Sequence, residues 1–224
     1  MENISDIAKT IDHTNLKVNA TVQDIRKTCL EAKTYGFRSV CVNLRWAKLA
    51  KEELKGSGVK VVVVIDWPCG ASLTEARVFQ AELAKKDGAD EIDPVMGVGD
   101  LKMGDYKTVL ADFKALAKVL PVKMIIETGF LTDEEIRKAA QLVKEAGCYC
   151  VKTSTGMEPK TDIDTKIQHV KLIRSVVGPD FPIKASGGIG SLEDAKRVIE
   201  AGANIIGTSS SLKIIGLSNK TESY

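Results

Sequence analysis

Short runs rich in β-branched residues alternate along the chain with longer stretches in which apolar residues recur at helical spacing. The short runs indicate buried strands, and the longer stretches indicate amphipathic helices. Helices are expected, for example, at Leu73–Lys86, Asp133–Ala146 and Leu192–Ala201. The pattern predicts eight strands, at Ile11–Thr14, Ser39–Asn43, Val59–Asp66, Ala89–Val95, Val122–Thr128, Cys148–Ser154, Pro182–Ser186 and Asn204–Thr208.

The expected helix boundaries carry their own signals. A capping residue followed three positions later by a carboxylate marks a helix start, and this occurs at Thr21…Asp24, Ser72…Glu75, Thr132…Glu135 and Ser191…Asp194. The residue after a helix often adopts a left-handed backbone, which favours glycine. Glycines stand at such places before the next strand, at Gly36, Gly58, Gly88, Gly147 and Gly202.

Eight strands joined by helices indicate a parallel sheet, because parallel strands need long crossover connections. Eight such units close into a (β/α)8 TIM barrel, the α/β fold predicted here for residues 1–224 as a single domain. Residues 1–9 are expected to form a short helix that caps one end, and a C-terminal tail is expected from about residue 213. An open doubly wound sheet would carry a Gly-x-Gly-x-x-Gly turn after its first strand, and none is found there.

Charge and composition exclude several classes of protein. The 224 residues include 32 basic and 30 acidic side chains, a balance that argues against a nucleic-acid partner. The longest apolar run, Val61–Ile65, is far shorter than the roughly 20 residues that span a bilayer. The first residues lack the features of a signal peptide, so a soluble cytoplasmic protein is expected. The five cysteines are an odd number in a chain without an export signal, so they are expected to be free thiols. A zinc site is not expected, because Cys148-Tyr-Cys150 lacks the C-x2-C spacing.

Two lysines stand near the ends of neighbouring strands, where barrels of this kind carry their active sites. Lys152 shares one strand face with Cys148 and Cys150, and this face is expected to line the barrel interior. Lys184 lies on the next strand, so the two ammonium groups should be close. Like charges in a partly desolvated site favour loss of a proton. A neutral lysine can attack a carbonyl group to form a Schiff base.

Carboxylates and glycine-rich loops complete the expected site. Asp93 and Glu91 share a strand face, and Asp93 could balance the lysines and move protons, whereas Glu91 receives no role. Asp12 is either a further polar contact or an ion-pair residue. Loops after the seventh and eighth strands commonly bind phosphate in this fold. Gly187-Gly188 and Gly207-Thr-Ser-Ser210 stand there, which indicates a phosphorylated substrate.

These residues belong to a longer set of matching stretches, at Ile11–Thr14, Ser39–Asn43, Gly88–Asp93, Lys123–Thr128, Val151–Gly156 and Lys184–Ile189. On these stretches the chain resembles the deoxyribose-phosphate aldolase family of class I aldolases, from about residue 8 to about residue 212. The resemblance implies reversible cleavage of 2-deoxy-D-ribose 5-phosphate to acetaldehyde and D-glyceraldehyde 3-phosphate. It also implies that no metal or organic cofactor is needed, and that the protein forms a homodimer or homotetramer.

The resemblance implies roles for individual residues. Lys152 would form the Schiff base, Lys184 would promote loss of its proton, and Asp93 would belong to a proton relay. Residues near the substrate would be Asp12, Thr14, Cys41 and Thr155, with Tyr224 of the tail as a further candidate. The phosphate site would comprise Gly187, Gly188, Gly207, Ser209 and Ser210.

The chain also departs from the family pattern, at Leu44, Gly97, Met157 and Gly190. Gly190 stands where an arginine is usual, which removes a cation near the expected phosphate site. These departures bear on phosphate affinity and substrate preference. Three other functions stay open: a Schiff-base aldolase for other aldehydes, a phosphosugar isomerase that forms no imine, and a catalytically silent barrel that binds a sugar phosphate.

Overall fold

The computed structural model describes residues 3–157 and 159–217. All eight expected strands are present, each within two residues of its expected start. The strands are β1 (Ile11–Asn15), β2 (Ser39–Asn43), β3 (Lys60–Ile65), β4 (Glu91–Pro94), β5 (Lys123–Ile125), β6 (Cys150–Lys152), β7 (Ile183–Ser186) and β8 (Ile205–Thr208). The fold prediction is therefore confirmed.

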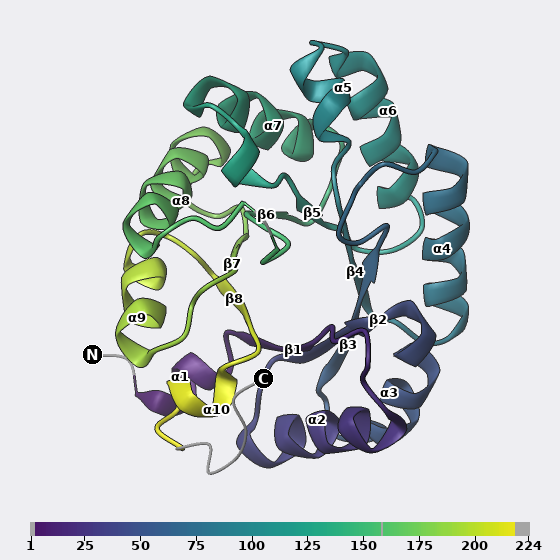
Figure 1. The fold of residues 1–224 in the computed structure, drawn as a ribbon, viewed down its shortest axis with the longest axis vertical. Helices are drawn as coiled ribbons and strands as arrows, with labels where there is room; N and C mark the ends of the chain where they lie inside the picture. Colours follow the sequence, from purple (N-terminus) through teal and green to yellow (C-terminus); the bar gives the residue numbers. More distant parts are fainter. Residues whose placement is uncertain (1–2, 158, 218–224) are drawn as a thin grey trace.

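The strands form one parallel sheet that curves into a barrel (Figure 1). Their order is β4-β3-β2-β1-β8-β7-β6-β5. Two short bridges, Ile92 to Val122 and Val95 to Ile125, join β4 to β5 and close the ring. Lys152 lies directly opposite Lys184 in the pairing of β6 with β7, so both lysines occupy the same level of the barrel.

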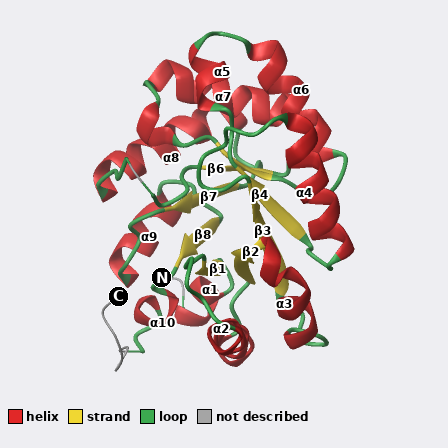
Figure 2. Cartoon of the chain, turned by 45° about the vertical axis from the view of Figure 1, so that its right-hand side comes forward, coloured by secondary structure: helices red, strands yellow, loops and turns green. Residues whose placement is uncertain are grey.

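Helices surround the strands on the outside (Figures 1 and 2). They are α1 (Ile4–Ala8), α2 (Val22–Tyr35), α3 (Ala47–Glu53), α4 (Thr74–Lys86), α5 (Val98–Lys102), α6 (Tyr106–Ala117), α7 (Asp133–Glu145), α8 (Ile163–Val177), α9 (Leu192–Glu200) and α10 (Ser211–Ile214). Short 3-10 helices occur at η1 (Leu44–Trp46) and η2 (Thr128–Phe130). Within residues 3–157 and 159–217, no helix is long and apolar enough to cross a membrane.

The elements near the two ends of the described chain can be compared with those expected from the sequence. Helix α1 directly precedes β1 and buries Ile7 and Ala8 in the main core, as expected for a helix at the amino-terminal end of the barrel. Helix α10 occupies residues where the tail was expected to begin. Tyr224 lies outside the described residues, so its place near the substrate stays a prediction.

Most helix caps follow the sequence signals. Thr21 and Thr132 form capping boxes with Asp24 and Glu135, and Ser191 caps α9. The expected cap at Ser72 is wrong: its hydroxyl donates to Asp66 Oδ1 at 2.7 Å, and α4 begins after Leu73 without a side-chain cap. Here the strand-end carboxylate binds the serine that would otherwise cap the helix.

Strand alternation separates two different interiors. Outward-facing residues such as Val40, Val63 and Ile92 pack with the helices into one large apolar core. Burial of this layer supplies the main stabilisation of the fold. Cys148 also packs there, so its expected place inside the barrel is wrong, because β6 begins only at Cys150. The inward-facing residues are largely charged, and they form the candidate site.

Candidate active site

Inward-facing charges from five strands meet inside the barrel. Each is at most 3% exposed, and each stands at an inward position of its strand. The side chains are Asp12 on β1, Glu91 and Asp93 on β4, Lys123 on β5, Lys152 on β6 and Lys184 on β7. Burial of charges at this density is tolerated only where each one is paired and hydrogen-bonded.

Asp93 connects the two lysines that the sequence singled out. Its Oδ2 accepts hydrogen bonds from Lys152 Nζ and from Lys184 Nζ, each at 2.8 Å. The structure therefore brings together the three residues expected at the centre of the site. A single carboxylate oxygen that touches two ammonium groups is well placed to pass a proton in the neighbourhood of Lys152.

Five of these charges, together with Arg38, close into a ring in which cations and carboxylates alternate. Arg38 joins Asp12 to Glu91, with Nη1 at 2.7 Å from Asp12 Oδ1 and Nη2 at 2.6 Å from Glu91 Oε1. Lys123 joins Glu91 to Asp93, at 2.6 Å and 2.9 Å. Lys184 joins Asp93 to Asp12, at 2.8 Å and 2.5 Å. We call these six residues the charge ring: Asp12, Arg38, Glu91, Lys123, Asp93 and Lys184.

The carboxylates of the charge ring stay ionised. Burial alone would raise their pKa values, but the neighbouring cations outweigh burial. The pKa of Asp12 is lowered chiefly by Lys184, and the pKa of Asp93 is lowered well below its usual value chiefly by Lys123. Lys123 and Arg38 together lower the pKa of Glu91 to about 2. All three groups are therefore negative at neutral pH.

The cations of the ring stay charged for the reciprocal reason. Burial would lower the pKa of Lys184, but Asp12 and Asp93 raise it above its usual value. The same carboxylates raise the pKa of Lys123. From the sequence, Lys184 was expected to act on Lys152 as a like charge, with Asp93 as the carboxylate that could balance both lysines. In the structure Asp12 also compensates Lys184, so the like-charge expectation needs this correction.

Lys152 stands outside the balanced ring. The ring contains three carboxylates and three cations, so it is neutral as a unit, and Lys152 adds one further positive charge on Asp93. Loss of a proton from Lys152 therefore leaves no ring carboxylate without its cation. The neutral amine is the form of lysine that attacks a carbonyl carbon.

The remaining residues expected near the substrate lie at the same end of the barrel. Cys41 faces the interior from β2 and packs against Val62 and Val64, and burial raises the pKa of its thiol. Thr14 follows Asp12 by two positions on β1 and is half-buried. Thr155 is buried just beyond β6, and its Oγ1 accepts a hydrogen bond from the Met157 amide at 3.1 Å.

Four of the five residues expected to bind phosphate lie in loops, and Gly207 lies within a strand. Gly188, Ser209 and Ser210 lie in the loops after β7 and β8, and they are at least partly exposed. Gly187 packs against the loop after β6, since an added Cβ would lie 3.1 Å from Gly156 Cα. Gly207 lies inside β8 instead, where a Cβ would lie 2.5 Å from Ser186 Oγ and 2.8 Å from Lys184 Cε. Its lack of a side chain leaves room for both of these side chains on β7.

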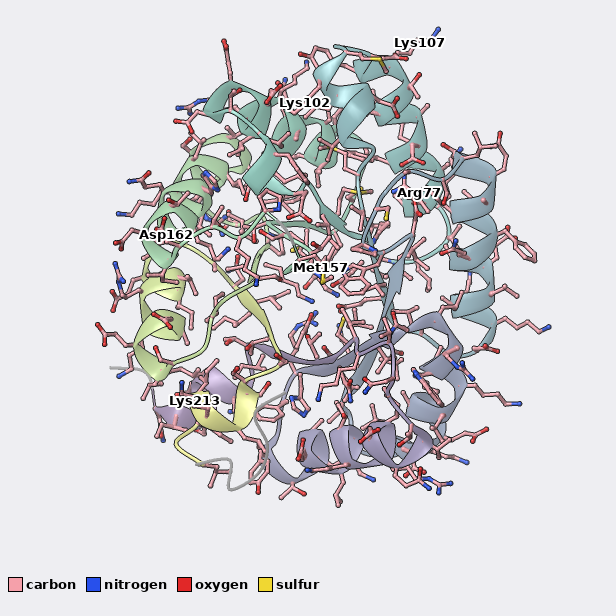
Figure 3. The ribbon with its side chains drawn as sticks, viewed as in Figure 1. Arg77, Lys102, Lys107, Met157, Asp162 and Lys213 are labelled. Carbon is pink, nitrogen blue, oxygen red and sulfur yellow. The ribbon has the colours of Figure 1, made fainter. Side chains whose placement is uncertain are left out.

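Three of the unusual residues lie in loops that follow strands: Gly97 after β4, Met157 after β6 and Gly190 after β7. Met157 is half-exposed and lies near the barrel axis in Figure 3. A side chain at Gly190 would meet only open space, so the structure leaves room there for the missing arginine. A Cβ at Gly97 would lie 2.7 Å from Asp100 Oδ2, so Asp100 occupies the space of a side chain at this position.

The sequence assigned no role to the buried residues Glu91, Lys123 and Glu127 near the site, or to the partly buried Arg38. Glu127 has a left-handed backbone with φ 52°, and its carboxylate accepts a hydrogen bond from the Thr155 amide at 3.0 Å. Lys123 and Glu127 could have been found by strand alternation, since Met124 and Ile126 between them face the outer core. Arg38 precedes β2, where alternation gives no guidance.

Comparison with known proteins places the chain among aldolases. The model of the DeoC/LacD family aldolases matches residues 7–217. The chain is 52% identical over 217 residues to a deoxyribose-phosphate aldolase of Thermococcus gammatolerans, which covers 94% of this chain and 95% of that protein. It is 48% identical over 220 residues to one of Caldanaerobacter subterraneus, with coverage of 96% and 94%.

A solved structure shows the same arrangement of the chain. The tetrameric deoxyribose-phosphate aldolase of Aeropyrum pernix superposes with a TM-score of 0.85 at 32% identity. The superposition covers 96% of this chain and 91% of that one.

Proposed function

Because the chain belongs to the DeoC/LacD family of aldolases, we propose that it reversibly cleaves 2-deoxy-D-ribose 5-phosphate to acetaldehyde and D-glyceraldehyde 3-phosphate. One observation carries the proposal most directly. Lys152 lies buried at the substrate end of the barrel, attached through Asp93 to a charge ring that is already neutral. A buried lysine nitrogen that touches a carboxylate able to take up its proton suits the role of a Schiff-base nucleophile.

The reaction begins with the amine of Lys152. Neutral Nζ adds to the aldehyde carbon C1 of the open-chain sugar, and loss of water from the carbinolamine gives an iminium ion. The iminium draws electrons from the C2–C3 bond, which breaks as the hydroxyl on C3 loses its proton. D-Glyceraldehyde 3-phosphate leaves, and an enamine remains on Lys152. Protonation of the enamine at C2 and addition of water then release acetaldehyde and restore the amine.

Asp93 and Lys184 supply the proton transfer and the charge stabilisation that these reaction steps require. Asp93 Oδ2 touches Lys152 Nζ, so it is placed to take up and return protons through water as the nitrogen changes charge. Lys184 remains an ammonium group because Asp12 and Asp93 hold it. Its fixed positive charge faces the position where negative charge develops during proton transfer, which stabilises the transition state.

The phosphate of the substrate would lie against the loops after β7 and β8. Gly187 has φ 81° and Gly188 has φ 70°, and these left-handed positions turn the backbone sharply in the first loop. Successive amide groups in such turns form a natural anion site. Ser209 and Ser210 add hydroxyl donors from the second loop.

We propose, by similarity to the tetrameric relative, that the chain assembles into a homo-oligomer. We also propose a cytoplasmic location, since a charged sugar phosphate does not cross a bilayer unaided.

A steady-state assay tests the proposed substrate. Purified protein is given 2-deoxyribose 5-phosphate, and the glyceraldehyde phosphate released is measured by a coupled dehydrogenase. Ribose 5-phosphate, 2-deoxyribose and other donor and acceptor aldehydes serve as comparison substrates. The matched variants are Lys152→Ala, expected to lose turnover, and Lys171→Ala on the exposed face of α8, expected to retain it. Turnover of another substrate at a higher kcat/KM, or full activity of Lys152→Ala, would contradict the proposal.

A further inference from the structure

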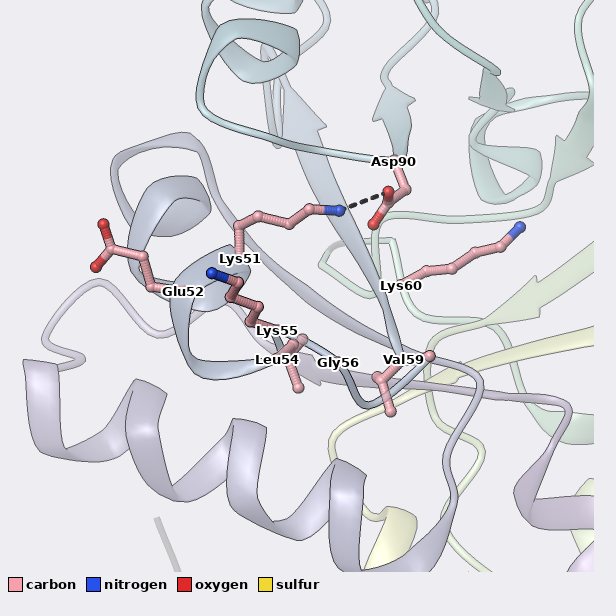
Figure 4. A pocket seen from close by; sticks show the side chains of 9 residues that line it. Lys51, Glu52, Leu54, Lys55, Gly56, Val59, Lys60 and Asp90 are labelled. Carbon is pink, nitrogen blue, oxygen red and sulfur yellow. Dashed lines mark hydrogen bonds and ion pairs between the residues drawn. The ribbon is translucent and has the colours of Figure 1, made fainter.

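A row of ion pairs reaches from the amino-terminal end of the barrel to Lys152. It begins at Lys60, the first residue of β3, whose side chain is 49% exposed and whose Nζ lies 2.7 Å from Glu91 Oε1. Figure 4 shows Lys60 beside a hollow at this end, next to the Lys51–Asp90 ion pair. From Glu91 the row continues through Lys123 and Asp93 to Lys152.

Glu91 is held on both of its oxygens. Oε1 accepts from Arg38 and Lys60, at 2.6 Å and 2.7 Å. Oε2 accepts from Lys123 at 2.6 Å and from Arg38 at 2.9 Å. With charge-assisted hydrogen bonds from three cations, the carboxylate has little freedom to turn. Its position is therefore fixed from the end of the barrel that lies opposite the substrate.

Lys123 contacts both Glu91 and Asp93, so the fixed position of Glu91 also restrains Asp93. Its Nζ lies 2.9 Å from Asp93 Oδ1, an ion pair outside the angular range of a hydrogen bond. With Oδ1 beside Lys123, the other oxygen points toward Lys152 and Lys184. Glu91 and Asp93 also stand two residues apart on β4, on the same face of the strand.

We propose that Glu91 is a positioning residue for the aldol reaction, which fixes Lys123 and thereby aims Asp93 Oδ2 at Lys152 and Lys184. The inference rests on the proposed function, and it assigns a task to an acid that does not touch the substrate. Glu91 also supplies one of the three negative charges that make the ring neutral. Removal of the Glu91 carboxylate therefore changes both the orientation of the Asp93 side chain and the net charge of the ring next to Lys152.

The electrostatic effect has a definite sign. The charged groups around Glu91 are Arg38 before β2, Lys60 on β3, Lys123 on β5, Asp93 on β4 itself and Asp12 on β1. Replacement of Glu91 by glutamine removes one negative charge and leaves all the cations. Lys152 then faces a positive ring, which disfavours its ammonium form. The acid limb of the pH profile of kcat/KM moves to lower pH.

The test compares the full chain with its Glu91→Gln variant. We expect the acid limb to move down by about one pH unit, the size expected of one charge at this range in a partly buried site. We also expect kcat to fall by roughly tenfold to a hundredfold, because Asp93 is no longer aimed correctly. A merely structural role would lower the unfolding temperature and leave the pH profile of the folded fraction in place.

Two further variants control the experiment. Lys51→Gln breaks the Lys51–Asp90 ion pair at the same end of the barrel without reaching the charge ring, and it should keep the wild-type profile and kcat. The double variant Glu91→Gln/Lys123→Gln removes one charge of each sign. It should return the acid limb to within about 0.3 pH unit of wild type while kcat stays low. It also serves as the test should Glu91→Gln alone fail to fold.

The outcomes separate this inference from the proposed function. An unshifted acid limb with full kcat in folded Glu91→Gln would overturn the inference, and so would wild-type kcat in the double variant. If the wild-type chain does not turn over 2-deoxyribose 5-phosphate, the proposed function fails instead. Glu91 would be established as a positioning residue by two results together. Glu91→Gln must shift the acid limb and lower kcat, and the double variant Glu91→Gln/Lys123→Gln must restore the position of the limb while kcat stays low.

Discussion

Lys152 and Lys184 differ in their charge environment although they lie at paired positions on adjacent strands. Lys184 has two carboxylate partners, Asp12 and Asp93, and belongs to the neutral ring. Lys152 shares Asp93 with Lys184 and adds a charge beyond that ring. Two carboxylates therefore hold Lys184 as a cation, and one of them, Asp93, also lies within reach of Lys152.

Replacement of Lys184 by leucine tests this division. The variant leaves three ring carboxylates with two ring cations, so Lys152 becomes the missing counter-ion and keeps its proton. We expect at least a roughly hundredfold loss of kcat/KM at neutral pH, with the acid limb displaced to higher pH. The pH profile of kcat/KM for the folded variant is the measurement. An unchanged profile would show that Lys184 does not act through charge.

At the level of elements, one buried arginine ties two helices to the strand that carries Asp93. Arg77 on α4 is 3% exposed, and its Nη1 lies 2.6 Å from Asp112 Oδ2 on α6. Its Nη2 donates to the carbonyl oxygen of Val95, just beyond β4. Figure 3 places Arg77 between α4 and the barrel. Burial raises the pKa of Asp112 despite this partner, so the ion pair only partly offsets the cost of burying that charge.

Removal of Asp112 alone should therefore lower the free energy of unfolding more than removal of both Arg77 and Asp112. Asp112→Ala leaves the buried Arg77 charge with only the longer ion pair to Asp66 Oδ2, at 3.7 Å, among the described residues, and we expect a loss of about 3 kcal/mol in the free energy of unfolding. The double variant Arg77→Met/Asp112→Leu removes both charges and fills the space, and it should recover most of that loss. Urea unfolding of the two variants measures the difference. Equal or greater destabilisation of the double variant would contradict this account.

Over the whole molecule, the charge ring links stability to pH. The pKa of Glu91 falls from an ordinary 4.5 to about 2 on folding, and those of Asp12 and Asp93 also fall. Lowered carboxyl pKa values stabilise the fold above their unfolded values, and this stabilisation is lost as the pH drops through the folded ones. For Glu91 alone it amounts to about 3 kcal/mol. Lys123 and Lys184 have raised pKa values, so their stabilisation is complete below 10.5 and lost at higher pH.

The expected stability profile therefore has a plateau with two falling sides. The unfolding temperature should be nearly constant between about pH 7 and about pH 9, because the raised pKa values of the buried thiols Cys29, Cys148 and Cys150 and the lowered pKa of His169 act outside that range. It should fall steeply below about pH 4.5. Thermal unfolding followed by circular dichroism across this range measures the profile. A constant unfolding temperature down to about pH 2 would mean that the ring carboxylates do not stabilise the fold.

The sequence predicted the barrel and the centre of the site for identifiable reasons. Short runs of β-branched residues and glycine stops located all eight strands, and alternation on β6 and β4 placed Lys152 and Asp93 inside. The charge ring was not foreseen, because it joins residues from four strands and from Arg38 before β2. Such a ring depends on how the strands close, and no local pattern encodes that closure. Ser72 shows the same limit, since Asp66 binds its hydroxyl across the loop.

Borohydride trapping tests the central claim, that Lys152 forms an imine with the substrate, most directly. The protein is treated with sodium borohydride in the presence and absence of 2-deoxyribose 5-phosphate, digested and analysed by mass spectrometry. We predict a substrate-dependent, reduced adduct on Lys152, and none on Lys123 or Lys184, whose ammonium groups the carboxylates hold. Folded protein that forms no adduct, or forms it on Lys184, would contradict the account.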